Sequence, residues 1–134
     1  MSCNFFTALP KEFPWQKRFK LLAKALLKKE KKNTAVNVIL CGDIEQRKLN
    51  RNYRNLDRVT DVLSFVWNEP VLLGEIYIAE GQVKRQAPVY GNTYYMELKW
   101  VLVHGLLHLC GYNHHSKAER KIMREKERFY LGGK

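Results

Sequence analysis

The feature that most constrains this chain is the segment from Thr93 to Cys110, which is almost entirely apolar after Trp100. A helix that is apolar all round is stable only when most of its faces are covered by protein. We therefore expect a central buried helix around which the rest of the chain packs. Gly111 follows directly, and a glycine in the left-handed conformation is a common way to end a helix.

Three of the four histidines fall in the sequence HGLLHLCGYNH, at the end of this helix and just after it. His104 and His108 are four residues apart, so they project side by side from one helix face. His114 would lie about 240° further round an unbroken helix, so a turn at Gly111 must bring it back to the pair. Three imidazoles leave the fourth tetrahedral position of a zinc ion open, as catalytic zinc requires.

Two alternatives share this histidine spacing. An HxxxH pair on an apolar helix is also typical of hydrogen-bonded core histidines, but leaving imidazoles buried and unpaired costs roughly 1 to 3 kcal/mol each. The third histidine after a glycine therefore favours a metal site. The spacing also matches metzincin metalloproteases, but Gly105 stands where those enzymes carry a glutamate as general base, which argues against peptide hydrolysis. His115 would point elsewhere and is not assigned as a ligand.

Periodicity elsewhere predicts an α+β arrangement. Apolar residues at helical spacing and short β-branched runs indicate the elements. The expected helices are 15–29, 43–53, 80–86, 93–110 and a basic one after Ser116, and the expected strands are 35–41, 62–66 and 74–79. Asp43 with Gln46, and Ser116 with Glu119, have the spacing of capping boxes. This order of elements is typical of an α+β sandwich.

Length and charge narrow the class of protein. The 134 residues fit a single domain, 1–134, and 24 Lys and Arg against 13 Asp and Glu give a net charge of +11. This positive charge is larger than solubility requires, and it indicates a polyanionic partner. We expect no membrane partner and a cytoplasmic location, because there is no spanning run of ~20 apolar residues and no signal pattern. Three cysteines without paired spacing argue against disulfides.

The histidine motif, followed by Glu119 and Met123, resembles the signature of the YbeY-type bacterial endoribonucleases of ribosomal RNA maturation. Two further blocks resemble that family in the right order, LNRNYRNLDRVTDVLSF at 49–65 and LGEIYIA at 73–79. Two positions depart from it. Asn113 stands where the family usually has aspartate, so it cannot take a proton, and Val66 and Trp67 replace a proline-containing continuation.

The resemblance implies a small mixed β-sheet flanked by helices, with a central buried helix that carries the metal site. It implies one zinc ion per chain and, as the metal ligands, His104, His108 and His114. It also implies a functional Arg54 and a zinc-dependent, single-strand-specific endoribonuclease of ribosomal RNA maturation and ribosome quality control. The implied partners are single-stranded RNA, above all ribosomal RNA, and ribosomal or assembly proteins. A family N-terminal strand would correspond to 3–9 or be missing.

Two further residues are candidates for the site. Arg54 lies in a polar segment between an expected helix and strand, where a guanidinium can clamp a phosphate through two hydrogen bonds. An ordinary surface arginine is the alternative, and the resemblance favours the catalytic role. Glu97 lies a heptad before His104 and is a candidate to orient it, although an exposed helix residue accounts for it equally well.

Basic and aromatic residues offer weaker indications. The basic residues of the first and last helices suit an electrostatic footprint for RNA, although such runs ordinarily form a solvated face. They are Lys17, Arg18, Lys20, Lys24, Lys28, Lys29, Lys31, Lys32, Lys117, Arg120, Lys121, Arg124, Lys126 and Arg128. Some aromatic residues could stack bases, but aromatics in so small a chain are mostly core, and none is assigned. The candidates are Phe5, Phe6, Trp15, Trp67, Tyr90, Tyr94 and Tyr95.

Two functional hypotheses follow. The first is a hydrolase, a metal-dependent endoribonuclease in which a zinc ion on three neutral imidazoles activates the phosphodiester. The attacking group, water or the RNA's own 2′-hydroxyl, stays open. The second is an assembly factor that binds ribosomal RNA, with a structural zinc and little catalytic activity. The open coordination position favours the enzyme, since structural zinc normally has four protein ligands.

Overall fold

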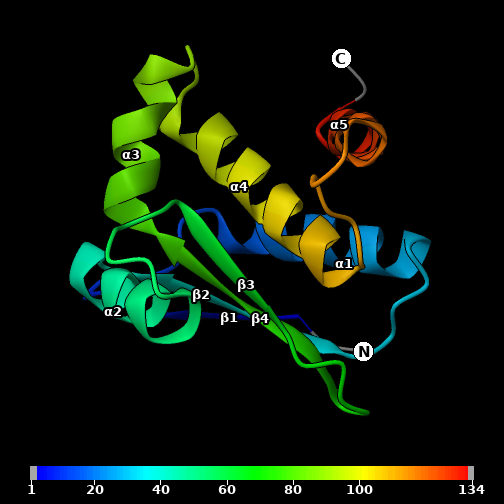
Figure 1. Cartoon of the computed structure of the whole chain (residues 1–134), viewed down its shortest axis with the longest axis horizontal. Coiled ribbons are helices and arrows are strands. Elements are labelled where there is room, and N and C mark those ends of the chain that lie inside the picture. Colours follow the sequence, from blue (N-terminus) through cyan, green and yellow to red (C-terminus); the bar gives the residue numbers. More distant parts are fainter. Residues whose placement is uncertain (1–2, 133–134) are drawn as a thin grey trace.

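The structure, a computed structural model, describes residues 3–132. Its strands are β1 (Cys3–Thr7), β2 (Ala35–Cys41), β3 (Val62–Val66) and β4 (Leu72–Ala79). Its helices are α1 (Gln16–Lys29), α2 (Asp43–Arg54), α3 (Glu80–Val89), α4 (Tyr94–Leu109) and α5 (Lys117–Tyr130) (Figure 1). The predicted α+β class is confirmed. No helix among these residues has the length and apolar character needed to cross a membrane.

The four strands form one mixed sheet in the order β1-β2-β4-β3. β1, β2 and β4 are parallel, and β3 pairs antiparallel with β4 at one edge. The N-terminal strand, which the sequence placed within 3–9 or left missing, is present as β1. Cys3 to Thr7 pair in register with Val36 to Leu40. The turn between β3 and β4 projects at one end of the sheet, and α2 lies at the other (Figure 1).

The core forms where α1 and α4 pack on one face of the sheet, here called the inner face. Leu98, Leu102 and Leu106 of α4 are fully buried, as are Val38 and Ile76 of the strands. This confirms the predicted central buried helix. Burial on this scale provides the main stabilisation of so small a fold, at about 25 cal/mol per Å² of apolar surface.

Gly105 lies where α4 packs closely against the sheet. A Cβ at this position would lie 3.1 Å from Ile76 Cγ2 and 3.2 Å from Ser64 Oγ. A larger side chain at this position, such as the glutamate of metalloproteases, would therefore have to displace Ile76, Ser64 or the helix itself. The close packing thus favours glycine over a general base at this position.

Local corrections concern helix ends. The capping box predicted from Asp43 and Gln46 is wrong: Gly42 is the N-cap without a side-chain bond, and Gln46 is buried and accepts a hydrogen bond from the Thr60 amide at 2.9 Å. The helix predicted to end before Pro88 instead continues through it to Val89. Pro88 removes the one bond that its N–H would donate to the Lys84 carbonyl, and the helix ends one residue later.

Other local predictions are confirmed. Ser116 and Glu119 form the reciprocal capping box of α5, with hydrogen bonds of 3.1 and 2.9 Å. Cys3, Cys41 and Cys110 are free thiols. Burial raises the pKa of Cys3 and of Cys41 to about 12, so both are inert at neutral pH.

Candidate metal centre

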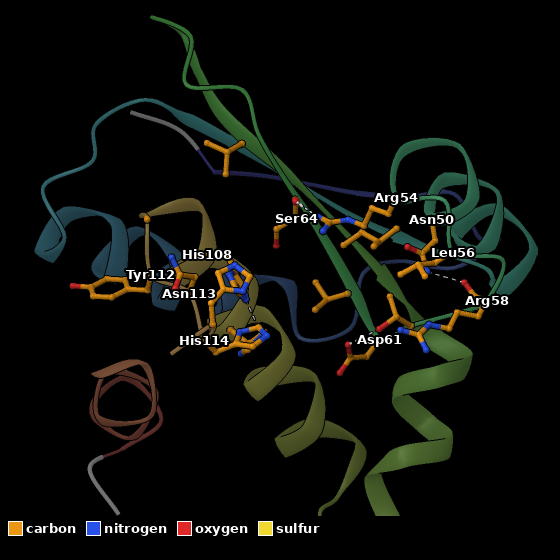
Figure 2. A pocket seen from close by; sticks show the side chains of 17 residues that line it. Asn50, Arg54, Leu56, Arg58, Asp61, Ser64, His108, Tyr112, Asn113 and His114 are labelled. Carbon is orange, nitrogen blue, oxygen red and sulfur yellow. Dashed lines mark hydrogen bonds between the residues drawn. The ribbon is translucent and has the colours of Figure 1, made fainter. Parts of the chain in front are cut away.

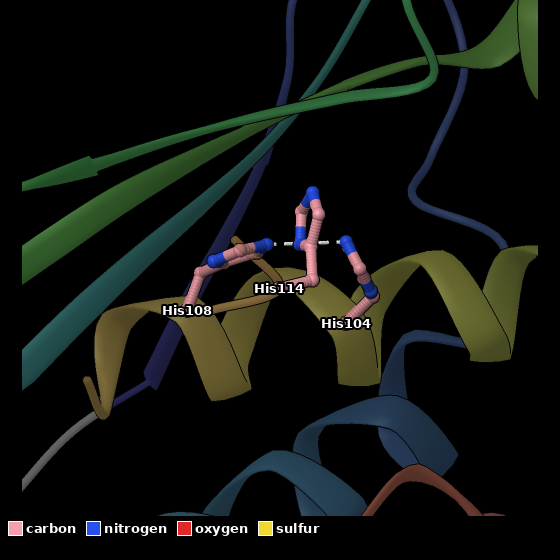
Figure 3. A group of neighbouring side chains, drawn as sticks. All are labelled: His104, His108 and His114. Carbon is pink, nitrogen blue, oxygen red and sulfur yellow. Dashed lines mark hydrogen bonds between the residues drawn. The ribbon is translucent and has the colours of Figure 1, made fainter. Parts of the chain in front are cut away.

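The structure brings His104, His108 and His114 into one cluster (Figure 3). One ligand atom from each of the three rings lies within 4.8 Å of the others. The first two histidines come from the last turns of α4, as their four-residue spacing predicts. The three histidines could thus hold a single metal ion.

The return of His114 depends on the end of α4. Gly111 has a φ of +104°, which favours glycine, and its amide donates to the carbonyl of His108 at 3.0 Å. The Tyr112 amide donates to Leu107 O at 3.1 Å, so the chain folds back over the last turn. The predicted turn at Gly111 is confirmed.

A carboxylate from α5 orients the first histidine. His104 Nδ1 lies 2.6 Å from Oε2 of Glu127, which is only 8% exposed. With Nδ1–H donating to this carboxylate, the lone pair of His104 sits on Nε2 and points into the cluster, 3.2 Å from His108 Nε2. Such a partner fixes the tautomer and increases the basicity of a ligating imidazole. Trp100 stacks on the His104 ring and restricts it further.

Glu97 does not orient His104. It is buried at 1% exposure and accepts hydrogen bonds from Gln86 and Asn92, at 2.7 and 2.8 Å. In the structure, Glu97 lies on the face of α4 that packs against α3, whereas the residue that orients His104 comes from α5. The residue that orients His104 was missed, because Glu127 lies 23 positions away and nothing local signals the contact.

Burial and neighbouring groups keep His108 neutral. Burial lowers the pKa of His108 to about 4, and the nearby His104, His114 and Arg54 add to the effect in that order. His108 is therefore uncharged at neutral pH. The neutral imidazole is the form that binds a metal, so no proton has to be removed from His108 before a cation enters.

The cluster lines one side of a cavity of about 610 Å³ (Figure 2). α4 and the segment after Gly111 form one wall, and α2, the segment after it and β3 form the other. The second wall carries Arg54 and Arg58. The cavity therefore places cationic side chains opposite the histidines.

Arg54 reaches this cavity from a different position than predicted. It is the last residue of α2 rather than part of a loop, and Asn55 ends the helix in the left-handed conformation. Its Nη2 donates to the Ser64 carbonyl at 2.8 Å, and its Cζ lies 5.6 Å from the Phe65 ring centroid. Both contacts hold an exposed guanidinium beside the cavity.

Two polar residues of the cavity were not singled out by the sequence. Asn50 is 1% exposed and donates to Arg58 O at 3.0 Å, which fixes the segment after α2. Asp61 accepts from Gln86 at 2.8 Å, and Gln86 also donates to Glu97. The Asn113 Oδ1 atom is buried without a partner among residues 3–132. For Asn50 the only sequence signal was its position one helical turn before Arg54, which places both side chains on the same face of α2.

Fold and site together define a class, namely α+β proteins with a three-histidine metal-binding motif on a buried helix. The family model described as Endoribonuclease YbeY matches residues 6–133. The chain therefore belongs to the endoribonuclease YbeY family, as its resemblance predicted.

Individual relatives agree with this membership. A protein named endoribonuclease YbeY from Endomicrobium trichonymphae is 42% identical over 109 residues, covering 81% of this chain and 77% of the relative. Its counterpart from Acholeplasma laidlawii is 37% identical over 125 residues, covering 92% and 89%. A solution structure from Thermotoga maritima superposes with a TM-score of 0.71 at 35% identity, covering 98% of this chain and 87% of that one.

Proposed function

We propose that the chain is a zinc-dependent endoribonuclease that cleaves single-stranded RNA, with ribosomal RNA as its substrate in ribosome maturation and quality control. The observation that carries the proposal is the shared cavity, in which three convergent imidazoles face Arg54. Membership of the endoribonuclease YbeY family supports the reaction class. A ribosomal RNA substrate also agrees with a cytoplasmic location.

The donor set fits one zinc ion per chain, held by His104, His108 and His114. Two nitrogens that each lie about 2.0–2.1 Å from one tetrahedral zinc are about 3.3 Å apart. The His104 and His108 Nε2 atoms are separated by 3.2 Å, close to this value. A bound zinc ion would act as a Lewis acid on the phosphodiester and lower the pKa of water.

Arg54 supplies the phosphate contact in this proposal. Its bond to Ser64 O engages one N–H of Nη2, so further donors of the guanidinium remain for phosphate oxygens. A guanidinium binds phosphate through paired, charge-assisted hydrogen bonds. Arg54 thus holds the scissile phosphate against the histidine wall and stabilises negative charge that develops during cleavage.

Size and charge support single-stranded RNA as the substrate. A cavity of about 610 Å³ is of the size that encloses a small ligand, so it suits one unstacked nucleotide and excludes a duplex. The net charge of +11 favours a polyanion. Arg120 of α5 lies beside the cluster, where its Nη1 donates to His114 O at 3.5 Å.

The test is a cleavage assay on single-stranded and duplex RNA, with wild type and Arg54→Ala at measured zinc content. Arg51→Ala is the matched control, because Arg51 is an exposed arginine of the same helix that does not line the cavity. We expect wild type and Arg51→Ala to cut the single strand only. Zinc-loaded wild type that binds RNA without cutting it would instead support the assembly-factor alternative.

A further inference from the structure

A second hollow, of about 60 Å³, lies on the other face of the sheet, here called the outer face. Ser64 and Ile76 point to Gly105 on the inner face, so their neighbours Phe65, Glu75 and Tyr77 point outward. The residues that line the hollow are Leu49, Tyr53, Phe65, Trp67, Glu75 and Tyr77. The residues Tyr53, Phe65, Trp67 and Tyr77 are called the aromatic platform below.

The aromatic platform is ordered yet accessible. Phe65 is its centre, with ring centroids 5.5 Å from Tyr53, 6.4 Å from Trp67 and 5.8 Å from Tyr77. Trp67 is 47% exposed and Tyr53 66% exposed, and Trp67 Nε1 donates to Glu75 Oε1 at 3.0 Å. Large aromatic faces held in fixed orientations at the surface indicate a binding site.

Arg54 connects the aromatic platform to the histidine cavity. The alternation of β3 at the sheet edge turns Ser64 toward the cavity and Phe65 toward the platform. The Arg54 guanidinium lines the cavity and also lies 5.6 Å from the Phe65 ring centroid. A chain that leaves the cavity beside Arg54 and crosses the edge of β3 therefore meets the aromatic platform next.

We propose that the aromatic platform binds unpaired bases of the RNA strand next to the phosphate held by Arg54. This proposal rests on the proposed function. Bases stack on exposed aromatic side chains of a sheet, and this contact tolerates different sequences. The Glu75 carboxylate beside Trp67 can accept a hydrogen bond from an exocyclic amino group of a base.

The chemistry of the hollow favours RNA over an apolar protein segment. Glu75 and Arg54 place a carboxylate and a guanidinium at its border, and each keeps hydrogen-bonding atoms beyond its bond to Trp67 or to Ser64 O, which an apolar segment could not engage. The phosphates of an RNA strand pair with Arg54, while its bases offer both stacking faces and N–H donors. The platform thus extends the substrate site beyond the scissile nucleotide.

The test compares binding and cleavage of two single-stranded RNAs, one of about four nucleotides and one of about twelve, near the lower end and in the upper half of the site sizes of about 4 to 16 nucleotides known for stacking platforms. Zinc-loaded wild type is compared with Trp67→Ala, Trp67→Phe and the control Tyr90→Ala. Tyr90 is 68% exposed at the end of α3 and lines neither hollow. Dissociation constants come from fluorescence anisotropy, and kcat and KM from cleavage.

We expect Trp67→Ala to weaken binding of the longer RNA and raise its KM about tenfold, at unchanged kcat. The short RNA should be bound and cut as by wild type, Trp67→Phe should restore most of the loss, and Tyr90→Ala should change nothing. Equal affinity of Trp67→Ala and wild type for the longer RNA would overturn the proposal. If wild type binds RNA without cutting it, only the proposed function is contradicted. The comparison of dissociation constants between wild type and Trp67→Ala still tests whether the aromatic platform binds RNA.

Discussion

The two walls of the histidine cavity differ in how the fold holds them. On the α4 wall, His104 and His108 are partly buried in a helix whose other faces form the core, and Glu127 fixes one ring from α5. On the facing wall, Arg54 is exposed at a helix end and held by one hydrogen bond and one aromatic contact. Core packing therefore sets the geometry of the histidines, whereas the wall proposed to bind phosphate is held by fewer contacts and can adjust to a substrate.

The largest effect is expected from His114→Ala. His114 is the exposed member of the cluster, so its loss should change the stability of the metal-free protein by only about 0.5 kcal/mol or less. Two remaining imidazoles make a poor site, so zinc retention and cleavage should both be lost. Elemental analysis and denaturant unfolding measure the two effects.

His115→Ala is the matched control, since His115 is the exposed neighbour outside the cluster. It should retain zinc and activity. Wild-type zinc content in His114→Ala would remove this residue from the ligand set.

The next largest effect concerns the opposite wall. Arg54→Ala should lower kcat by roughly 10² to 10³, by analogy with the loss of one donor from an oxyanion site. RNA affinity should fall much less, because this is one phosphate contact among many. The variant should fold and bind zinc, since the Ser64 bond it loses is exposed and contributes about 1 kcal/mol.

Arg54→Lys separates the effect of charge from that of hydrogen-bond geometry, because lysine keeps the positive charge but cannot form the two parallel hydrogen bonds of a guanidinium. We expect it to recover only part of the rate. Cleavage by Arg54→Ala at the wild-type rate would make Arg54 an incidental surface residue.

A smaller effect is expected from Glu127→Gln. The amide can still accept from His104 Nδ1, but it no longer offers a negative charge to increase the basicity of the ring. Changes of this kind typically cost 10 to 100-fold in metal affinity. Competition with a chelator measures the loss, and Glu125→Gln, an exposed neighbour on α5, is the control. Equal zinc affinity in both variants would argue that Glu127 only packs α5 against α4.

Sequence periodicity was sufficient for the histidines and the turn of the α4 wall, and insufficient for the residues that reach the site from other elements. The spacing of His104 and His108, together with Gly111, is a local property of one helix and its end, and the structure confirms it. Asn50, Asp61 and Glu127 were missed because their contacts join segments far apart in the chain. Periodicity can assign a residue to a helix face but cannot say which element covers that face, as Glu97 shows.

The aromatic platform illustrates the same limit. The sequence offers Trp67 as one of several stacking candidates, but exposure separates a surface aromatic from a core one, and exposure depends on the register of β3 against β4. The short strand β1 was uncertain for a related reason, since its pairing with β2 is a long-range contact. Pro88 shows that a helix breaker near a helix end does not fix where the helix stops.

The smallest effect is a pH dependence of the metal-free protein. The pKa of His108 is about 4 in the fold against an ordinary value of 6.5, so the unfolded chain binds the proton more tightly. Stability should be constant above about pH 6.5 and fall as the pH decreases toward 4. Glu30 and Glu80, whose pKa values lie below the ordinary 4.5, contribute only in more acid solution.

Denaturant unfolding of zinc-free wild type between pH 5 and 7.5 measures this slope, with His108→Gln as the comparison. The variant should show a flatter profile. Identical profiles would mean that His108 titrates normally and that the α4 wall is more open to water than its packing indicates.

The central claim, that one zinc ion on the α4 wall enables cleavage of RNA held by the facing wall, is tested most directly by titrating metal-free wild type with zinc while RNA cleavage is recorded. Activity should rise linearly and saturate at one zinc per chain, as His104, His108 and His114 form one site. Full cleavage by the zinc-free protein, or no cleavage after one equivalent is bound, would contradict the claim.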